Sequence, residues 1–174
     1  MANHYRFELA RSPRCLRDYY ALRDAIFCRE QGLFEDGDID AIDTTAHPIV
    51  ALKTDSPLLA LPKVIGVVRI YEPEPRLWYG GRLGVHADHR RGWRIGKGLI
   101  TKAVTTANAW GCDRFLATVQ VQNVRFFRRL HWRSLESLTI QGRPHHLMEA
   151  DLAAYPPCVE ARVTPPGCDL LQAS

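Results

Sequence analysis

The sequence predicts an α+β fold in which a mixed, mainly antiparallel central sheet is layered with flanking helices. Three β-branched runs of strand length follow one another between residues 47 and 87, as the strands of a meander do. Two other segments carry apolar residues at steps of three and four, which is typical of helices that lay one face on a core. With 174 residues, 46% of them hydrophobic, the chain can bury one core, so we expect one domain.

The first elements are a strand and a helix. In HYRFELA, residues 4–10, the apolar residues Tyr5, Phe7 and Leu9 alternate with polar ones, which predicts a half-buried strand. Ser12 followed by Pro13 indicates a helix start, and Gly32 its end. The apolar stripe between them consists of Leu16, Tyr19, Leu22, Arg23, Ile26 and Phe27. An acidic loop follows this helix.

The meander leads into a second helix and a closing hairpin. Its strands are HPIVALK, KVIGVVRIYEP and LWYGGRLGVHA, which begin at residues 47, 63 and 77. A helical stripe then consists of Ile95, Leu99, Ile100, Ala103, Val104 and Ala107, with Gly111 as the expected C-cap. RFLATVQV from residue 114 predicts a buried strand, NVRFFRRL from residue 123 a short helix, and residues 137–152 a hairpin that turns near Gly142.

The segment after residue 154 differs in composition from the rest of the chain. Its two Pro-Pro pairs exclude a central strand or a long helix. We therefore divide the chain into one domain, residues 1–154, and a Pro-rich tail, residues 155–174, that either wraps the domain or stays mobile.

Charge and cysteine content exclude several functional classes. A net charge of +4 is too mild to indicate nucleic acid. The five cysteines are odd in number and include no Cys-x-x-Cys pair, which argues against a disulfide framework and a zinc site. The sequence has neither a signal-peptide core nor an apolar run of membrane-spanning length. We expect a cytoplasmic protein without nucleic-acid or membrane partners and, because its histidines lack metal-binding spacing, without a metal.

The stretch HADHRRGWRIGKGLI, residues 86–100, concentrates positive charge and glycine between a strand and a helix. The free N–H groups of a first helical turn, and the positive end of its dipole, point at such a loop. Gly92, Gly96 and Gly98 let a ligand approach closely, and the full charges are those of Arg90, Arg91, Arg94 and Lys97. This combination favours a pyrophosphate ligand over a solvated basic turn. The spacing fits neither a P-loop nor a dinucleotide fingerprint.

Three stretches resemble the acetyl-CoA-dependent N-acetyltransferases of the GNAT superfamily. Arg91-Gly92-Trp93-Arg94-Ile95-Gly96 resembles their Arg/Gln-x-x-Gly-x-Gly/Ala loop, with Arg94 at the position of the first glycine. QNVRFFRRLHW, residues 122–132, resembles their later Asn-containing helix. LRDAIFCREQG, residues 22–32, and the acidic loop after it resemble the opening of one branch, the nitrogen-starvation N-acetyltransferases.

The resemblance implies a fold and a donor. It implies a sheet that opens in a V between two central strands, with backbone groups of Leu83, Gly84 and Val85 pairing with the pantetheine arm of acetyl-CoA. Pantetheine has two amides, and a splayed strand offers unpaired N–H and C=O groups. The cofactor-binding residues implied are Leu83, Gly84, Val85, Arg90, Arg91, Gly92, Trp93, Arg94, Ile95, Gly96, Lys97, Gly98, Asn123, Phe126 and Phe127.

Acyl transfer to an amine needs a neutral amine, a donor for the oxyanion and a proton for the departing thiolate. A backbone N–H near Val85 can serve the oxyanion. Phe127 stands where the resembled family carries its acid, a tyrosine, and Tyr79 stands where some members carry a glutamate. Glu72, His86 and Glu30 remain alternative bases. The catalytic candidates are therefore Glu72, Tyr79 and His86.

The acidic loop DGDIDAID, residues 36–43, has two interpretations. It has acidic residues at the first three ligand positions of a calcium loop, but it lacks the required glycine and glutamate, so we expect no calcium. It is either a solvated loop or a surface that recognises a cationic amine. On the second interpretation the substrate-binding residues are Phe27, Glu30, Asp38 and Asp40.

The sequence thus predicts an N-acetyltransferase that moves an acetyl group to a small-molecule primary amine by direct transfer in a ternary complex, with homodimerisation open. Two alternatives remain. Arg23, Phe27, the acidic run, Arg69 and Arg82 resemble acyl-homoserine-lactone synthases, which take acyl chains from an acyl carrier protein. The third hypothesis, motivated by Phe127 and Tyr79 in place of the usual acid and base, is a sensor that binds acyl-CoA without turnover.

Overall fold

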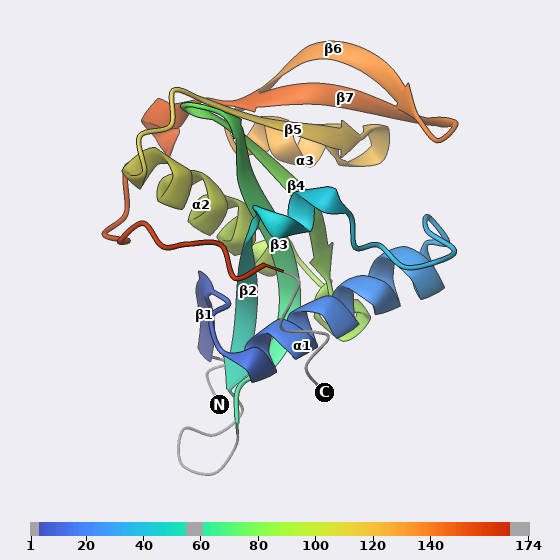
Figure 1. Ribbon diagram of the computed structural model, residues 1–174. Coiled ribbons are helices and arrows are strands. Elements are labelled where there is room, and N and C mark those ends of the chain that lie inside the picture. The colour runs from blue at the N-terminus through green and yellow to red at the C-terminus, as the bar shows by residue number, and fades with distance from the viewer. Residues whose placement is uncertain (1–3, 55–60, 168–174) are drawn as a thin grey trace.

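The computed structural model describes residues 4–54 and 61–167. It contains a seven-stranded sheet in the order β1-β2-β3-β4-β5-β7-β6 (Figure 1). The strands are β1 His4–Leu9, β2 His47–Thr54, β3 Lys63–Glu74, β4 Leu77–Val85, β5 Arg114–Gln120, β6 Trp132–Ile140 and β7 Arg143–Ala150. Neighbouring strands are antiparallel except for β4 and β5, which are parallel. The predicted α+β class and mixed sheet are confirmed.

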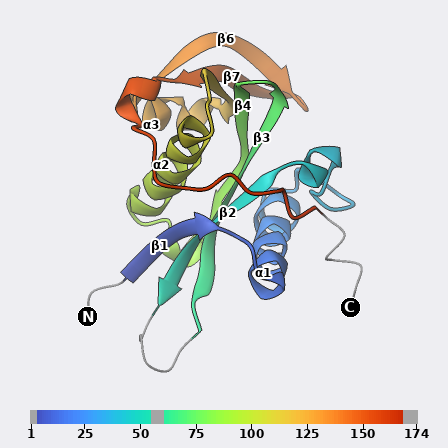
Figure 2. The same cartoon turned by 60° about the vertical axis from the view of Figure 1, so that its left-hand side comes forward.

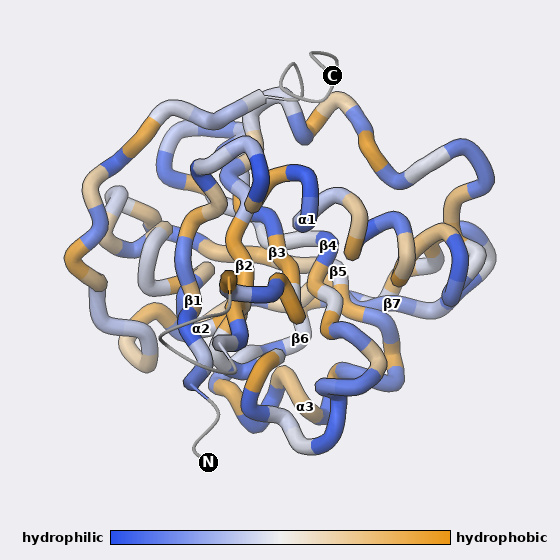
Figure 3. Tube along the Cα trace, turned by 90° about the horizontal axis from the view of Figure 1, so that it is seen from below, coloured by the Kyte–Doolittle hydropathy of each residue, from blue (hydrophilic) through white to orange (hydrophobic). Residues whose placement is uncertain are grey.

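The helices cover both faces of this sheet (Figure 2). They are α1 Pro13–Arg23, α2 Arg94–Ala109 and α3 Val124–Arg129. Alternate residues of β2 belong to two separate hydrophobic clusters: Ile49 and Ala51 pack with α2, whereas Val50 and Leu52 pack with α1. Strands buried on both faces read as continuous apolar runs, as β2 and β3 do in Figure 3.

Helix α1 begins where the sequence predicts. The Ser12 side chain accepts a hydrogen bond from the Cys15 N–H at 3.2 Å, and Pro13 occupies the first turn. The predicted stripe is buried. The structure differs in the last two turns, because Asp24–Glu30 is a π-helix in which the Gln31 N–H donates to Ile26 O. Phe27 of this π-helix lies against β4, 3.3 Å from where a Cβ on Gly84 would be.

Strand β4 is bent and splits from β5. In β3 the partners of Gly81 and Gly84 are Arg69 and Val67, so two β4 residues, Arg82 and Leu83, lie opposite Val68 alone. This is a β-bulge, and Arg82 has a φ of 53°. Pairing with β5 ends at Gly80 and Ala117, so the strands diverge beyond that point. The V-shaped splay implied by the resemblance is present.

Helix α2 closes the face of the sheet opposite α1. Its predicted stripe from Ile95 to Ala107 is buried, and Gly66 of β3 allows close packing, since a Cβ there would lie 2.9 Å from Leu99. The chain leaves the helix at Gly111, whose φ of 90° suits glycine at the residue after a C-cap. No described helix is long and apolar enough to span a membrane.

The described part of the Pro-rich tail, residues 155–167, lies against the domain. Tyr155 is buried in the α2-side core, where its hydroxyl accepts a hydrogen bond from Trp132 Nε1 and donates one to Leu130 O. Farther on, Glu160 pairs with Arg11 and Lys102, each at 2.7 Å. The tail therefore contributes to the core up to at least Tyr155, and its last seven residues lie outside the described part.

Candidate active site

A cavity of about 480 Å³ lies at the splay between β4 and β5. One wall is polar and belongs to the α1 side of the sheet, opposite the residues that pack on α2: Arg69, Tyr71, Tyr79, Arg82, Thr118, Gln120 and His145. The other wall is apolar and belongs to α2, α3 and the strands beneath them: Ile100, Ala103, Val104, Phe115, Phe127 and Trp132. The cavity therefore connects a polar face with an apolar one through the sheet.

The first turn of α2 provides an anion site next to this cavity. The helix has no side-chain cap and no acidic residue in its first turn. Lys97 is the first residue of the turn whose N–H finds an acceptor, Trp93 O at 2.9 Å, so the preceding amides are free to bind an anion. Gly92, with a φ of 78°, turns the chain into the helix. A pyrophosphate fits this arrangement.

The basic loop residues do not all face that site. Arg91, Arg94 and Lys97 are exposed and form no ion pair with a described carboxylate. Arg90 differs, since its guanidinium pairs with Glu30 and donates to Val85 O at 2.8 Å. Ile95 packs its side chain into the core, and Gly98 faces Phe7, whose ring lies 2.1 Å from where a Cβ would be. Gly98 thus serves packing rather than ligand approach.

The other residues expected to bind the cofactor gather around the splay. Leu83 lines the cavity, and the β5-facing edge of residues 81–85 has no strand partner in the part of the chain that the structure describes. Asn123 and Phe127 line the cavity from the start of α3. Phe126 instead contacts the first turn of α2, 3.6 Å from a Cβ placed on Gly96.

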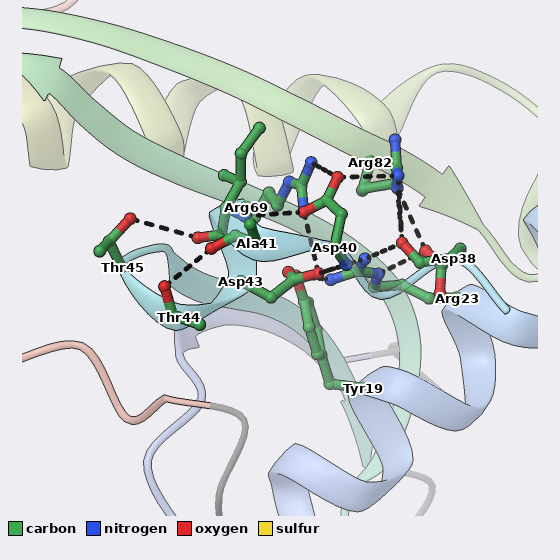
Figure 4. A network of polar contacts seen from close by, with 11 residues as sticks. Tyr19, Arg23, Asp38, Asp40, Ala41, Asp43, Thr44, Thr45, Arg69 and Arg82 are labelled. Carbon is green, nitrogen blue, oxygen red and sulfur yellow. Dashed lines mark hydrogen bonds and ion pairs between the residues drawn. The ribbon is translucent and has the colours of Figure 1, made fainter.

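Six charged residues, four of them buried, form a network that includes part of the polar wall (Figure 4). Arg23 of α1 pairs with Asp38 at 2.7 Å and with Asp43 at 2.6 Å. Arg69 of β3 donates two hydrogen bonds to the Asp40 carboxylate, of 2.6 and 2.8 Å. Arg82 of β4 reaches Asp38 and Asp40, each at 3.2 Å. Three arginines thus neutralise three carboxylates, and the acidic loop is held to the sheet.

The arginines decide the ionisation of this loop. Burial raises the pKa of Asp43, but the hydrogen bonds and charge of Arg23 outweigh it, so the pKa lies below its usual value. Burial acts on Asp40 in the same way, and there Arg69 and Arg82 lower its pKa. Both carboxylates therefore stay ionised at neutral pH and are poor proton acceptors.

Of the three catalytic candidates, only Tyr79 lines the cavity, stacked on Tyr71 with ring centroids 5.7 Å apart. Glu72 lies in a separate hollow, where it accepts a hydrogen bond from the Arg76 N–H at 2.7 Å and pairs with Arg162 of the tail. His86 follows β4 and accepts a hydrogen bond from the Asp88 N–H at 3.3 Å, away from the cavity. The three do not form one constellation.

The substrate-binding candidates divide in the same way. Phe27 and Asp40 line the cavity. Asp38 is only 2% exposed, and Glu30 is bound to Arg90, so the carboxylates of both are engaged by arginines.

Sequence reasoning missed Tyr71, Phe34 and His145 as cavity residues. Tyr71 could have been found from strand alternation, because it lies on the same face of β3 as Arg69 and is paired with the candidate residue Tyr79. His145 is of chemical interest, because its Nδ1 bonds Arg143 O at 2.8 Å and must therefore donate. In the neutral ring this hydrogen bond leaves Nε2 as the acceptor nitrogen.

The chain matches a known protein family. The sequence profile of the Acetyltransferase (GNAT) family matches residues 15–132. That segment includes most of α1, the acidic loop, the splayed strands, α2 and α3. A comparison with curated protein sequences returns no significant match.

Solved structures share the fold. A protein from Lactobacillus plantarum, provisionally assigned as an N-acetyltransferase, has a TM-score of 0.74 at 24% identity and covers 86% of this chain and 99% of its own. Escherichia coli ElaA has a TM-score of 0.70 at 22% identity and covers 86% and 100%. BjaI, a CoA-dependent acyl-homoserine lactone synthase solved with SAM and isopentyl-CoA, has a TM-score of 0.67 at 15% identity and covers 99% of both chains.

Proposed function

The chain belongs to the GNAT acetyltransferase family, and from this premise we propose that it transfers an acetyl group from acetyl-CoA to the primary amine of a small molecule. One observation supports the proposal above the others. The uncapped first turn of α2 lies next to the Phe126 ring of α3, and both helices line the cavity that passes between β4 and β5. The turn would hold the pyrophosphate, and the splay would hold the pantetheine arm.

The reaction is a direct transfer with both substrates bound. The lone pair of the neutral amine attacks the thioester carbonyl carbon, and the tetrahedral intermediate then breaks the C–S bond. The amine nitrogen loses one proton and the CoA thiolate gains one. Backbone N–H groups along the free edge of residues 81–85 are placed to stabilise the oxyanion, because the sheet already holds them in position.

Two side chains on the polar wall suit the proton transfers. The Tyr79 hydroxyl can donate a proton to the departing thiolate. Phe127 cannot do so, because it has no hydroxyl. The Nε2 of His145 can accept the amine proton directly or through water. The acceptor amine would approach across Phe27, Phe34 and Asp40, which lie on the same side of the cavity.

The four described cysteines are free thiols, which supports a cytoplasmic location.

Calorimetric titration with acetyl-CoA tests this proposal. The parent should bind, and the double variant Arg91→Glu/Gly96→Asp should not, because it puts two carboxylates at the anion site. The matched control is Arg17→Glu on α1, an exposed arginine on the opposite face of the sheet. A screen of primary amines with a free-thiol readout should then find a turnover that the double variant lacks. Absence of binding by the folded parent would reject the proposal.

A longer acyl donor is the second candidate. The apolar wall continues the cavity to Ile100, Ala103 and Val104, which leaves room for more than an acetyl group. An acyl-homoserine-lactone-synthase-like enzyme would use this space for a chain delivered by an acyl carrier protein. If so, Ala103→Leu should lower turnover of decanoyl donors and spare acetyl donors. Tight binding of acyl-CoA without transfer to any amine would favour the sensor instead.

A further inference from the structure

Helix α3 presents three arginines on one exposed face. Val124 and Phe127 are buried, whereas Arg125, Arg128 and Arg129 are exposed at the i, i+3, i+4 spacing that makes helix side chains neighbours. Like charges at this spacing repel, and no carboxylate of the described chain lies within ion-pair distance of any of them. Arg128 and Arg129 interact favourably with the C-terminal end of the helix dipole, but the three guanidinium groups have no anionic side chain as a partner, so an anion supplied from outside would stabilise this face.

Elsewhere on the described surface, arginines usually have an acidic partner. Arg76 pairs with Asp113 at 2.5 Å, and Arg114 and Arg133 share Glu149. The cations without an acidic partner gather instead at α3 and at the start of α2, as Arg91, Arg94, Lys97, Arg125, Arg128 and Arg129, with only scattered others such as Arg17.

The two basic groups form one surface. The Phe126 ring of α3 lies 3.6 Å from where a Cβ on Gly96 would be, so it lies next to the first turn of α2. Arg129 is the i+3 neighbour of Phe126 and lies on the same flank of α3. The surface therefore extends from the free amides of α2 onto the exposed face of α3.

CoA carries two anionic groups that lie at different places in the molecule. Its pyrophosphate suits the first turn of α2, but its ribose also carries a 3′-phosphate, a monoester with roughly −1.5 to −2 charges at pH 7. Guanidinium groups bind such an oxyanion through paired hydrogen bonds. We propose that Arg125, Arg128 and Arg129 bind the 3′-phosphate of CoA. This inference rests on the proposed function, because it assumes that α2 holds the pyrophosphate.

Calorimetry with CoA and with 3′-dephospho-CoA separates this site from the rest of the cofactor. The test variant is Arg125→Gln/Arg128→Gln, and the control is Arg14→Gln/Arg17→Gln on α1, which removes the same charge at the same spacing on the opposite face. Thermal unfolding checks that both variants fold. We expect the parent to bind CoA about 10- to 100-fold more tightly than 3′-dephospho-CoA. The test variant should lose that preference and keep its affinity for 3′-dephospho-CoA, whereas the control should behave as the parent.

Three results would overturn the assignment. Equal losses for both ligands would show that the arginines act on the whole cofactor, and unchanged affinities would remove them from the site. If the CoA affinities are unchanged but transfer from an acyl carrier protein falls, α3 is a docking surface for that acidic protein. Failure of the parent to bind either ligand is different, since it would reject the proposed function together with this inference.

Discussion

Arg23 and Asp43 form an ion pair of 2.6 Å between Nη1 and Oδ1 in which neither side chain is more than 1% exposed. Arg23 comes from the end of α1 and Asp43 from the acidic loop, so the pair fastens that loop over the sheet. Removal of one partner leaves the other charge buried without full compensation.

We expect Asp43→Ala to lower the free energy of unfolding by about 3 to 5 kcal/mol, because the buried guanidinium of Arg23 loses one of its carboxylate partners. Urea denaturation measures this. The control is Asp113→Ala, which breaks the Arg76–Asp113 pair, whose side chains are 61% and 59% exposed. Water already compensates that pair, so its loss should change stability little. Equal effects of the two substitutions would contradict the structural role of the network.

Tyr155 ties the tail to the core, and its hydroxyl gives the next prediction. Tyr155→Phe leaves two buried groups, Trp132 Nε1 and Leu130 O, without this partner, which should cost about 1 to 3 kcal/mol of unfolding free energy. Tyr5→Phe is the control, because no described hydrogen bond involves the Tyr5 hydroxyl. A tail that leaves the domain in solution would make the two substitutions indistinguishable.

The sequence predicted best what depends on neighbouring residues. The cap at Ser12, the stripe of α2, the turn at Gly111 and the hairpin at Gly142 are all local signals, and the structure contains each of them. The order of strands and helices follows from them. The π-helical turn at Asp24–Glu30 was not predictable in this way, because apolar spacing does not distinguish it from a continued α-helix.

Pairings between distant segments were not predictable from local patterns. The acidic loop had two interpretations, and the structure gives a third arrangement, in which arginines from α1, β3 and β4 occupy its carboxylates. The sequence makes Glu72 a candidate base, but in the structure it pairs with Arg162 of the tail, 90 residues away. Arg90 was expected to bind the cofactor, but Glu30, 60 residues away, holds it. In each case the partner is distant in the sequence and comes close only through the fold.

His47 should make stability depend on pH. Burial, and then the charge of Arg162, lowers the pKa of His47 from 6.5 to about 4, while Glu72 opposes this weakly. Below pH 6.5 His47 is protonated in the unfolded chain, but in the folded chain it stays neutral down to about pH 4. The free energy of unfolding therefore falls as the pH falls through this window. The loss attributable to His47 should reach roughly 3 kcal/mol by pH 4.

Denaturation of parent and His47→Gln across pH 4 to 7 measures this effect. The variant should show a shallower decline, by up to about 1.4 kcal/mol per pH unit, because one proton fewer distinguishes its two states. His4→Gln, an exposed histidine, is the control and should follow the parent. Parallel curves for parent and His47→Gln would mean that His47 titrates normally in the folded protein.

Gly98 should resist substitution despite its place in a helix. Alanine is favoured over glycine in helices by about 1 kcal/mol, but a Cβ at this position would lie 2.1 Å from the Phe7 ring. We expect Gly98→Ala to destabilise the protein by about 1 to 3 kcal/mol. In a Phe7→Ala background the contact is absent, so the same substitution should become neutral or stabilising. Destabilisation of equal size in both backgrounds would place the cause elsewhere.

His145 and His146 are adjacent in β7 but face opposite sides of the sheet, which makes them a matched pair for testing the proposed chemistry. His145 lines the cavity with a free Nε2, whereas His146 Nδ1 contacts Ser134 Oγ at 2.6 Å. If His145 accepts the amine proton, His145→Gln should lower kcat by about 10²- to 10⁴-fold at neutral pH. Its affinity for acetyl-CoA should be unchanged, because the donor is held by α2 and the splay.

Steady-state kinetics with a free-thiol readout, together with calorimetry, measures both quantities. His146→Gln should keep the parental kcat. An acceptor amine of lower pKa should partly restore the rate of His145→Gln, because its nitrogen, once bonded to the acyl carbon, gives up its proton to water more readily. A rate loss that is independent of amine pKa would assign His145 to the structure of the cavity wall rather than to proton transfer.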